Sequence, residues 1–190
     1  GPTANATTGT AAAITLDETT ANDTATVNYA TNFTTTNDYG TDGAGSVTYS
    51  LNFSGTDVAS GLTNLDGDSI VMNKVGNDIV GTVTDSSTTP ATVTTYFTIS
   101  NSGSSVTFTQ SENIKHGDAN NPDDSESLSA VANSLGLTQT ITDADGDTAS
   151  STLDLSTGVF AIQDDGPTAN ATTGTAAAIT LDETTANDTA

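Results

Sequence analysis

The first 25 residues of the chain recur, letter for letter, at its end. The run GPTANATTGTAAAITLDETTANDTA occupies residues 1–25 and again residues 166–190, an offset of 165 residues (166 − 1). Solenoid repeats are about 20–50 residues long, so a longer unit is better read as a whole domain that recurs in tandem. The sequence therefore predicts one complete unit and the opening of the next. The expected partners are adjacent identical repeats of the same chain, which we expect to be monomeric.

The composition at the repeat boundary indicates where the folded body lies. Residues 163–167 read Gln-Asp-Asp-Gly-Pro, and Pro167 pushes Gly166 toward extended geometry. We expect residues 1–13 to be a linker from the preceding unit and residues 14–165 to form the domain. Residues 166–190 are then a linker and the first segment of the next repeat.

The hydrophobic pattern predicts strands and no long helix. Val, Ile, Thr and Ser alternate along most of the chain, and no stretch carries a convincing 3.6-residue apolar period. Many short alternating strands between turn signals are typical of an all-β antiparallel sandwich or barrel. The predicted strands are residues 25–29, 46–53, 69–74, 78–84, 92–100, 104–110, 135–142 and 149–155.

The segments between these strands give three further expectations. The turn Asn101-Ser102-Gly103 joins two alternating runs and predicts a hairpin. Residues 112–126 are polar and are expected to form an ordered surface loop. A short helix is considered near residues 128–133.

The charge balance decides which partners are plausible. The chain has 2 Lys+Arg against 24 Asp+Glu, a net charge of -22. Binding to nucleic acid or to an anionic membrane needs a basic surface that this chain cannot build, and no apolar run reaches membrane-spanning length. A cation is the natural counterpart. A merely solubilising acidic surface is the alternative, but clusters of Asp with Gly and Asn suit oxygen-ligated Ca²⁺ better.

The sharpest candidate site is the run Asp143-Ala144-Asp145-Gly146-Asp147. Alternate carboxylates around a glycine turn can direct several oxygens toward one hard cation. The run begins like an EF-hand loop, but Thr148 stands where that loop needs glycine and a strand replaces the helix. We therefore predict a calcium turn. The alternative is a plain acidic turn closed by Asx hydrogen bonds.

A second group of acids marks the junction between units. If the strands after Asp147 pair as a hairpin, Asp164 and Asp165 would face the same pole of the domain as Asp143–Asp147. Acids at the start of the following unit would then approach them across the junction and complete a calcium site there. These acids are Asp182 and Glu183, equivalent to Asp17 and Glu18. The alternative is a flexible hinge with solvated acids.

Other residues provide weaker candidates. Additional acidic turns that could hold a metal contain Asp66 and Asp68, Asp38 and Asp42, and Asp118, Asp123 and Asp124. The chain has one histidine, His116, and only Lys74 and Lys115 as bases, so a Ser/His/Asp or zinc constellation has almost no material. Cysteine is absent, which excludes disulfides and thiolate sites. We expect no enzymatic activity.

Several of these runs occur together in an order that resembles a known family. In chain order they are LDET (16–19), VTYSL (47–51), FTI (97–99), VTFTQ (106–110), ITDADGD (141–147), TLDL (152–155) and DDGP (164–167). The set resembles the tandem repeats of giant RTX adhesins exported by type I secretion, including the class called T1SS-143 repeats. The resemblance implies an Ig-like β-sandwich extender on a Gram-negative cell surface, with Ca²⁺ near the junctions, that projects a distal tip for attachment or biofilm formation. The calcium positions it implies are Asp143, Asp145, Asp147, Asp164 and Asp165.

One functional alternative remains open at this point. In this alternative each repeat itself binds a surface glycan, since many weak sites in an array act together. Tyr39, beside Asp38 and Asp42, is the best aromatic candidate for such a site.

Overall fold

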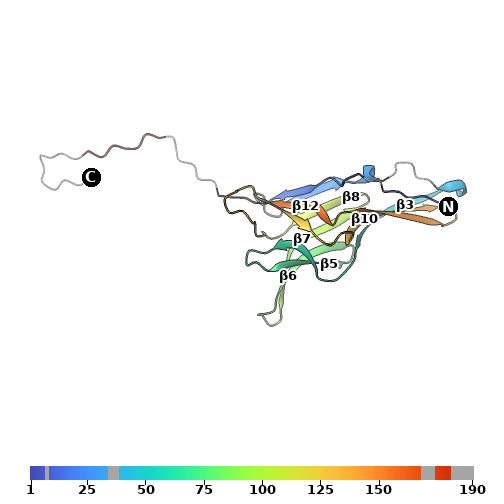
Figure 1. Ribbon diagram of the computed structural model, residues 1–190, viewed down its shortest axis with the longest axis horizontal. Coiled ribbons are helices and arrows are strands. Elements are labelled where there is room, and N and C mark those ends of the chain that lie inside the picture. The colour runs from blue at the N-terminus through green and yellow to red at the C-terminus, as the bar shows by residue number, and fades with distance from the viewer. Residues whose placement is uncertain (7–8, 34–38, 168–173, 181–190) are drawn as a thin grey trace.

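The computed structural model describes residues 1–6, 9–33, 39–167 and 174–180. These residues form a twelve-stranded β structure with two 3₁₀ turns, drawn in Figure 1. The strands are β1 (Ile14–Asp17), β2 (Thr24–Asn28), β3 (Ala44–Phe53), β4 (Val58–Thr63), β5 (Ser69–Val75), β6 (Asp78–Asp85), β7 (Thr92–Ser102), β8 (Ser105–Gln110), β9 (Ser125–Ser129), β10 (Leu135–Asp143), β11 (Thr148–Asp154) and β12 (Thr157–Gln163). The turns are η1 (Ala30–Asn32) and η2 (Gly40–Asp42).

The strands form a sandwich-like arrangement. One sheet has six strands in the order β2-β8-β7-β6-β5-β4. Two three-stranded sheets, β1-β12-β9 and β11-β10-β3, complete the arrangement. The prediction of an all-β, antiparallel sandwich is therefore confirmed. The exception is β1, which pairs in parallel with β12, Ile14 opposite Phe160. Entry and exit strands that run side by side in one direction suit a chain that enters a body at one end and leaves it at the other.

The core lies between the sheets and is dominated by aromatic and branched aliphatic side chains. Phe108 of β8 contacts Phe97 of β7 and Phe160 of β12 edge to face, with ring centroids 5.5 Å and 5.2 Å apart. These rings join the six-stranded sheet to the sheet of β12. Edge-to-face pairs add about 0.5–1.5 kcal/mol each beyond the area that they bury.

The predicted strands are recovered, and four others were missed. Each of the eight predicted ranges corresponds to a strand, and the hairpin around residues 101–103 is confirmed by the β7–β8 pairing. The strands that the pattern did not indicate are β1, β4, β9 and β12. They are short, contain a glycine with positive φ (Gly61, φ 83), or carry a continuous apolar run without alternation.

The helix considered near residues 128–133 is wrong. Leu128 is a buried residue of strand β9, and the chain then turns, with Ser134 donating its amide to the carbonyl of Val131. Asn133 has φ 62, a conformation that no helix interior contains. The polar loop over residues 112–126 has no strand before residue 125, where β9 begins.

The two copies of the repeated segment lie in different environments. In the first copy, Ile14 of β1 is 1% exposed in the core, and Tyr29 donates a hydrogen bond from its hydroxyl to the carbonyl of Ala12 (2.6 Å). In the second copy, the equivalent Ile179 is 75% exposed. Figure 1 draws the described residues 174–180 apart from the sandwich. Ile14 is therefore buried where β1 pairs with β12, and the same residue of the second copy is exposed.

Candidate metal centre

The predicted acidic turn is the tip of the β10–β11 hairpin. Its two strands pair from Gly136 opposite Asp154 to Thr142 opposite Thr148, so residues 143–147 close the turn. Gly146 has φ 101, which favours glycine at this position. The amide of Asp143 donates to the carbonyl of Asp147 (3.0 Å), which closes the loop.

A third segment brings another carboxylate to this tip. The turn η2 ends at Asp42, and the following Gly43 accepts a hydrogen bond from the amide of Ala144 (3.1 Å). At Gly45 an added Cβ would lie 2.4 Å from the carbonyl oxygens of Thr142 and Asp143, so only glycine permits this close approach. Ligand oxygens of Asp42, Asp143 and Asp145 then lie within 4.8 Å of one another. We call these three residues the tip cluster.

Asp143 is the buried member of the tip cluster. It is 3% exposed, and its Oδ1 accepts hydrogen bonds from the amides of Gly146 (3.1 Å) and Asp147 (2.9 Å). When Asp145 is ionised, Oδ2 of Asp143 is buried and has no hydrogen-bond partner. An unpartnered buried carboxylate oxygen is costly, and a cation is the group that would satisfy it among other carboxylates. The all-oxygen donor set fits Ca²⁺.

The charges in the tip cluster influence one another's protonation. When Asp145 holds a proton it can donate it to Asp143, and this shared hydrogen bond lowers the pKa of Asp143 and raises the pKa of Asp145. Desolvation raises the pKa of Asp145 further, as does repulsion from Asp143, Asp147 and Asp42. The carboxylates at the tip therefore repel one another, and a bound cation would offset this repulsion.

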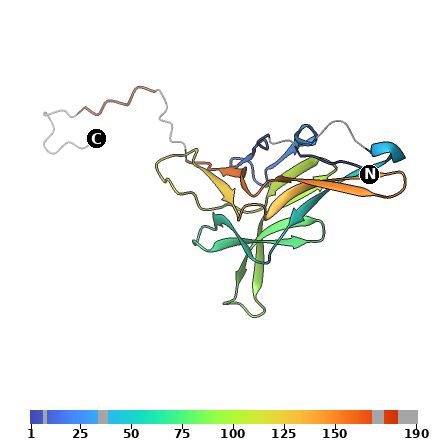
Figure 2. The same ribbon diagram turned by 45° about the vertical axis from the view of Figure 1, so that its right-hand side comes forward.

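The expectation that Asp164 and Asp165 face the same pole as residues 143–147 is wrong. Figures 1 and 2 show the β10–β11 tip beside the N-terminus and the exit to the C-terminal tail at the opposite end of the sandwich. The cause is that β12 does not fold back on β11. After Asp154 the chain passes into another sheet, where β12 pairs with β1 and β9.

At the exit end, Asp164 lies close to two residues that are distant from it in the sequence. Ligand atoms of Asp164, Glu18 and His116 lie within 4.8 Å of one another. Glu18 follows β1, and its amide donates to the carbonyl of Gln163 (3.0 Å). Sequence reasoning named Glu18 and Asp164 but placed them in different units of the array. It missed His116 as their neighbour, and no local signal links residues so far apart in the chain.

The remaining predicted ligands near the two ends do not join either group among the described residues. Asp17 caps its own turn, because its Oδ1 accepts the hydroxyl and the amide of Thr19, and these hydrogen bonds lower the pKa of Asp17. Asp147 is exposed at the rim of the tip, and Asp165 is exposed after Asp164. Asp38, Asp182 and Glu183 lie outside the described residues.

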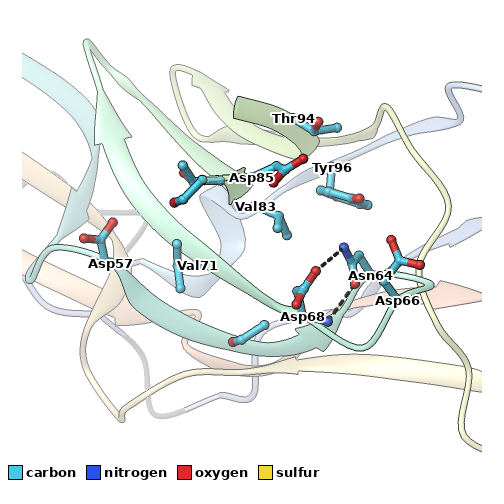
Figure 3. Close-up of a pocket in the computed structure, with 12 residues that line it drawn as sticks. Asp57, Asn64, Asp66, Asp68, Val71, Val83, Asp85, Thr94 and Tyr96 are labelled. Atoms are coloured by element: carbon cyan, nitrogen blue, oxygen red, sulfur yellow. Dashed lines mark hydrogen bonds between the residues drawn. The ribbon is translucent and has the colours of Figure 1, made fainter. Parts of the chain in front are cut away.

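In the weaker acidic turns, the carboxylates of Asp68, Asp118 and Asp124 already accept hydrogen bonds from neighbouring groups of the same segment. Asp68 accepts a hydrogen bond from Asn64 Nδ2 (3.1 Å) and donates its amide to Asn64 Oδ1 (2.7 Å). Figure 3 shows Asp66 and Asp68 on the wall of a hollow of about 720 Å³, with Asp57, Asp85 and Tyr96 spread around it and not converging on one point. In the polar loop over residues 111–124, which we call the exit loop, the Asp118 carboxylate accepts the amide of Asn120, and the Asp124 carboxylate accepts the amides of Asp118 and Ser125.

Comparison with known proteins supplies one match. A family model described as a domain of unknown function, DUF5801, matches residues 13–156. The chain belongs to the DUF5801 family. The DUF5801 match begins just before β1 and ends after β11, so it includes the tip cluster and excludes β12 and Asp164. No curated protein and no solved structure matches the chain. Within the described part of this DUF5801 chain, no helix is long and apolar enough to cross a membrane.

Proposed function

We propose that this DUF5801 unit is a calcium-stabilised, non-enzymatic extender module in the stalk of a large bacterial surface adhesin. The observation that carries the proposal is the exact recurrence of residues 1–25 at residues 166–190. In an array of identical units, the function depends on the number of units and on the total length of the array. The ordered set of motifs that resembles RTX adhesin repeats supports export by type I secretion and a place on the cell surface.

Calcium is the ion that the tip cluster suits best. Asp42, Asp143 and Asp145 supply only oxygen ligands, and one of these oxygens is buried without a donor. When bound, the ion neutralises mutually repelling carboxylates and stabilises the folded state by mass action. Extracellular calcium modules bind with dissociation constants of about 10⁻⁴–10⁻³ M, so the unit would fold most stably outside the cell.

The repeat register supports a calcium site between units. Gly1 is equivalent to Gly166, so in an array the residue before Gly1 is the equivalent of Asp165. Gly1 lies beside the tip, because a Cβ added to it would lie 3.6 Å from Asp147 Oδ2, and a Cβ added to Gly40 would lie 2.7 Å from the Gly1 carbonyl oxygen. The preceding unit would therefore deliver its final aspartate next to the tip cluster.

The same glycine position is also held at the exit end. The amide of Gly166 donates to the carbonyl of Pro122 (3.0 Å), and an added Cβ would lie 2.3 Å from the Pro122 ring. One glycine would thus contact the exit loop of one unit and the tip of the next. This leaves little free linker between bodies and supports a stiff rod, in which calcium at the tip cluster fixes the angle between neighbours.

Direct ligand binding by each repeat is the second candidate. The hollow in Figure 3 combines carboxylates, including Asp57 and Asp85, with the ring of Tyr96, a set of groups that can contact a sugar. Retention of a single unit on a glycan array, lost in Tyr96→Ala, would favour this candidate over a purely structural role.

Equilibrium dialysis with radioactive calcium tests the calcium part of the proposal. We expect saturable binding with a dissociation constant of about 10⁻⁴–10⁻³ M that equimolar magnesium does not displace. Asp143→Asn should abolish the site assigned to the tip cluster, whereas Asp85→Asn, at an exposed turn, should leave it unchanged. Equal binding by the wild type and Asp143→Asn would contradict the assignment.

A further inference from the structure

The only histidine of the chain is buried at the exit end and faces two carboxylates. The His116 side chain is 6% exposed and that of Glu18 is 4% exposed. His116 Nε2 lies 3.7 Å from Glu18 Oε2, and Asp164 completes a group whose ligand atoms lie within 4.8 Å of one another. We call Glu18, His116 and Asp164 the exit cluster. It is distinct from the tip cluster, which lies at the opposite end of the sandwich (Figure 1).

Each member of the exit cluster is held by its own anchor. Glu18 Oε1 accepts hydrogen bonds from Gln110 Nε2 (2.6 Å) and from the amide of Ile114 (2.9 Å), which leaves Oε2 for His116. The amide of Asp164 donates to the carbonyl of Asp124 (2.7 Å). These contacts fix three ligand-bearing segments, the end of β1, the exit loop and the end of β12, before any ion is bound.

The neighbours of His116 in the chain are anchored as well. The amide of Lys115 donates to the carbonyl of Thr63 (2.9 Å), and the amide of Gly117 donates to Glu126 Oε1 (3.0 Å). The imidazole is therefore positioned from both sides. A ligand held in place by the fold loses little conformational freedom when a metal binds.

The imidazole itself lacks the partners that its burial demands. Both ring nitrogens of His116 are buried and make no hydrogen bond. A buried polar atom without a partner destabilises the fold, so such atoms are rare unless a ligand satisfies them. The contact with Glu18 is too long for a hydrogen bond. A group that bonds to nitrogen and to carboxylate oxygen at the same time would satisfy the exit cluster.

The ligand atoms of the exit cluster, one imidazole and two carboxylates, indicate which class of ion would bind there. Calcium takes oxygen ligands, whereas imidazole with carboxylates suits first-row transition metals such as zinc. Three protein ligands leave positions for water, and a cavity of about 340 Å³ lined by Glu18, His116 and Asp164 gives an ion access. We propose that Glu18, His116 and Asp164 form a second metal centre that binds a divalent first-row transition metal, with zinc as the test ion.

Binding at this centre would have a mechanical consequence. Asp164 is the first residue after β12, and Gly166 begins the next repeat. An ion that ties Asp164 to Glu18 and His116 holds the chain where it leaves the domain. The two metal centres would then act on opposite sides of one junction, calcium on the entry side of one unit and the transition metal on the exit side of its predecessor.

Zinc titration of this chain in calcium-saturated buffer, followed by calorimetry, tests the proposal. We expect one zinc site that weakens at least tenfold in His116→Gln and is unchanged in Asp143→Asn, the matched variant of the tip cluster. Equal zinc affinity in His116→Gln and the wild type would overturn the proposal. So would loss of the site in Asp143→Asn, because zinc would then be occupying the tip cluster.

A spectroscopic measurement keeps the test decisive if His116→Gln does not fold. Because the chain has one histidine, the nitrogen-15 NMR signals of its imidazole report on His116 alone. Saturating zinc should shift the signal of one ring nitrogen strongly, as direct coordination requires. Imidazole signals that stay in place when zinc is bound would show that the ion lies elsewhere and would refute the centre.

Discussion

Replacing Asp143 by asparagine separates the role of its charge from the role of its shape. Asparagine is nearly the same size, and its carbonyl oxygen can still accept the amides of Gly146 and Asp147 that Oδ1 accepts in the wild type. What the variant loses is the negative charge and the unpartnered Oδ2. In the absence of calcium this substitution removes repulsion from Asp42 and Asp145, so it should not destabilise the hairpin tip.

The expected size of the calcium effect follows from mass action. With a dissociation constant of about 10⁻⁴–10⁻³ M, about 10 mM calcium is a tenfold to hundredfold excess. The folded state then gains about 1.4–2.7 kcal/mol. For a domain of this size 1 kcal/mol moves the melting temperature by about 2–4 °C, so the wild type should melt about 3–11 °C higher in calcium than in chelator.

Thermal melts of both proteins, followed by circular dichroism, measure this difference. Asp143→Asn should gain less than about 1 °C from calcium and should melt in chelator at or above the wild-type temperature. Magnesium at the same concentration controls for charge screening, and Asp85→Asn controls for the loss of one charge elsewhere. A calcium gain in Asp143→Asn equal to that of the wild type would refute the reasoning.

Three further predictions follow from the packing and the pKa shifts. Ile14→Asp should unfold the domain, because Ile14 is buried, whereas Ile179→Asp, in an identical local sequence, should leave the melting temperature of this chain unchanged and should destabilise the second body only in a two-unit chain. Gly81→Ala should cost about 1–3 kcal/mol in urea unfolding, because its Cβ would lie 2.3 Å from an aromatic ring of β7, and Gly174→Ala, with nothing within 4 Å, is its control. Burial opposes ionisation of Asp154, but hydrogen bonds from Ser156 and a backbone amide outweigh it and lower its pKa. The wild type should therefore exceed Asp154→Asn in stability at neutral pH, and the difference should shrink as the pH falls below about 4, as acid-dependent denaturation would show.

The sequence predicts the sheet strands well where alternation is strong. The row Val47, Tyr49, Leu51 and Phe53 identifies β3 because one face of that strand packs on the core. The same rule fails for β12, whose residues 159–162 are all buried and therefore show no alternation. The short strand β1 was missed for another reason: four residues carry too little pattern to be distinguished from a turn.

The candidate sites show the same division between local and distant information. The tip of the β10–β11 hairpin is predictable because its carboxylates alternate within five residues of the sequence, around a glycine. Asp42 was only a weak candidate, since its place beside Asp143 depends on the β3–β10 pairing between residues about 100 positions apart. The exit cluster depends on the parallel register of β1 with β12, which no local pattern encodes. The error about the poles arose from assuming that β12 folds back on β11.

Small-angle X-ray scattering of a chain with two complete units, in calcium and in chelator, tests the central claim most directly. The account predicts that calcium raises the radius of gyration and the maximum dimension as the junction stiffens, and that Asp143→Asn in the second unit removes this change while both bodies stay folded by circular dichroism. Scattering curves that coincide with and without calcium, for two folded bodies, would contradict the proposal of a calcium-stiffened extender.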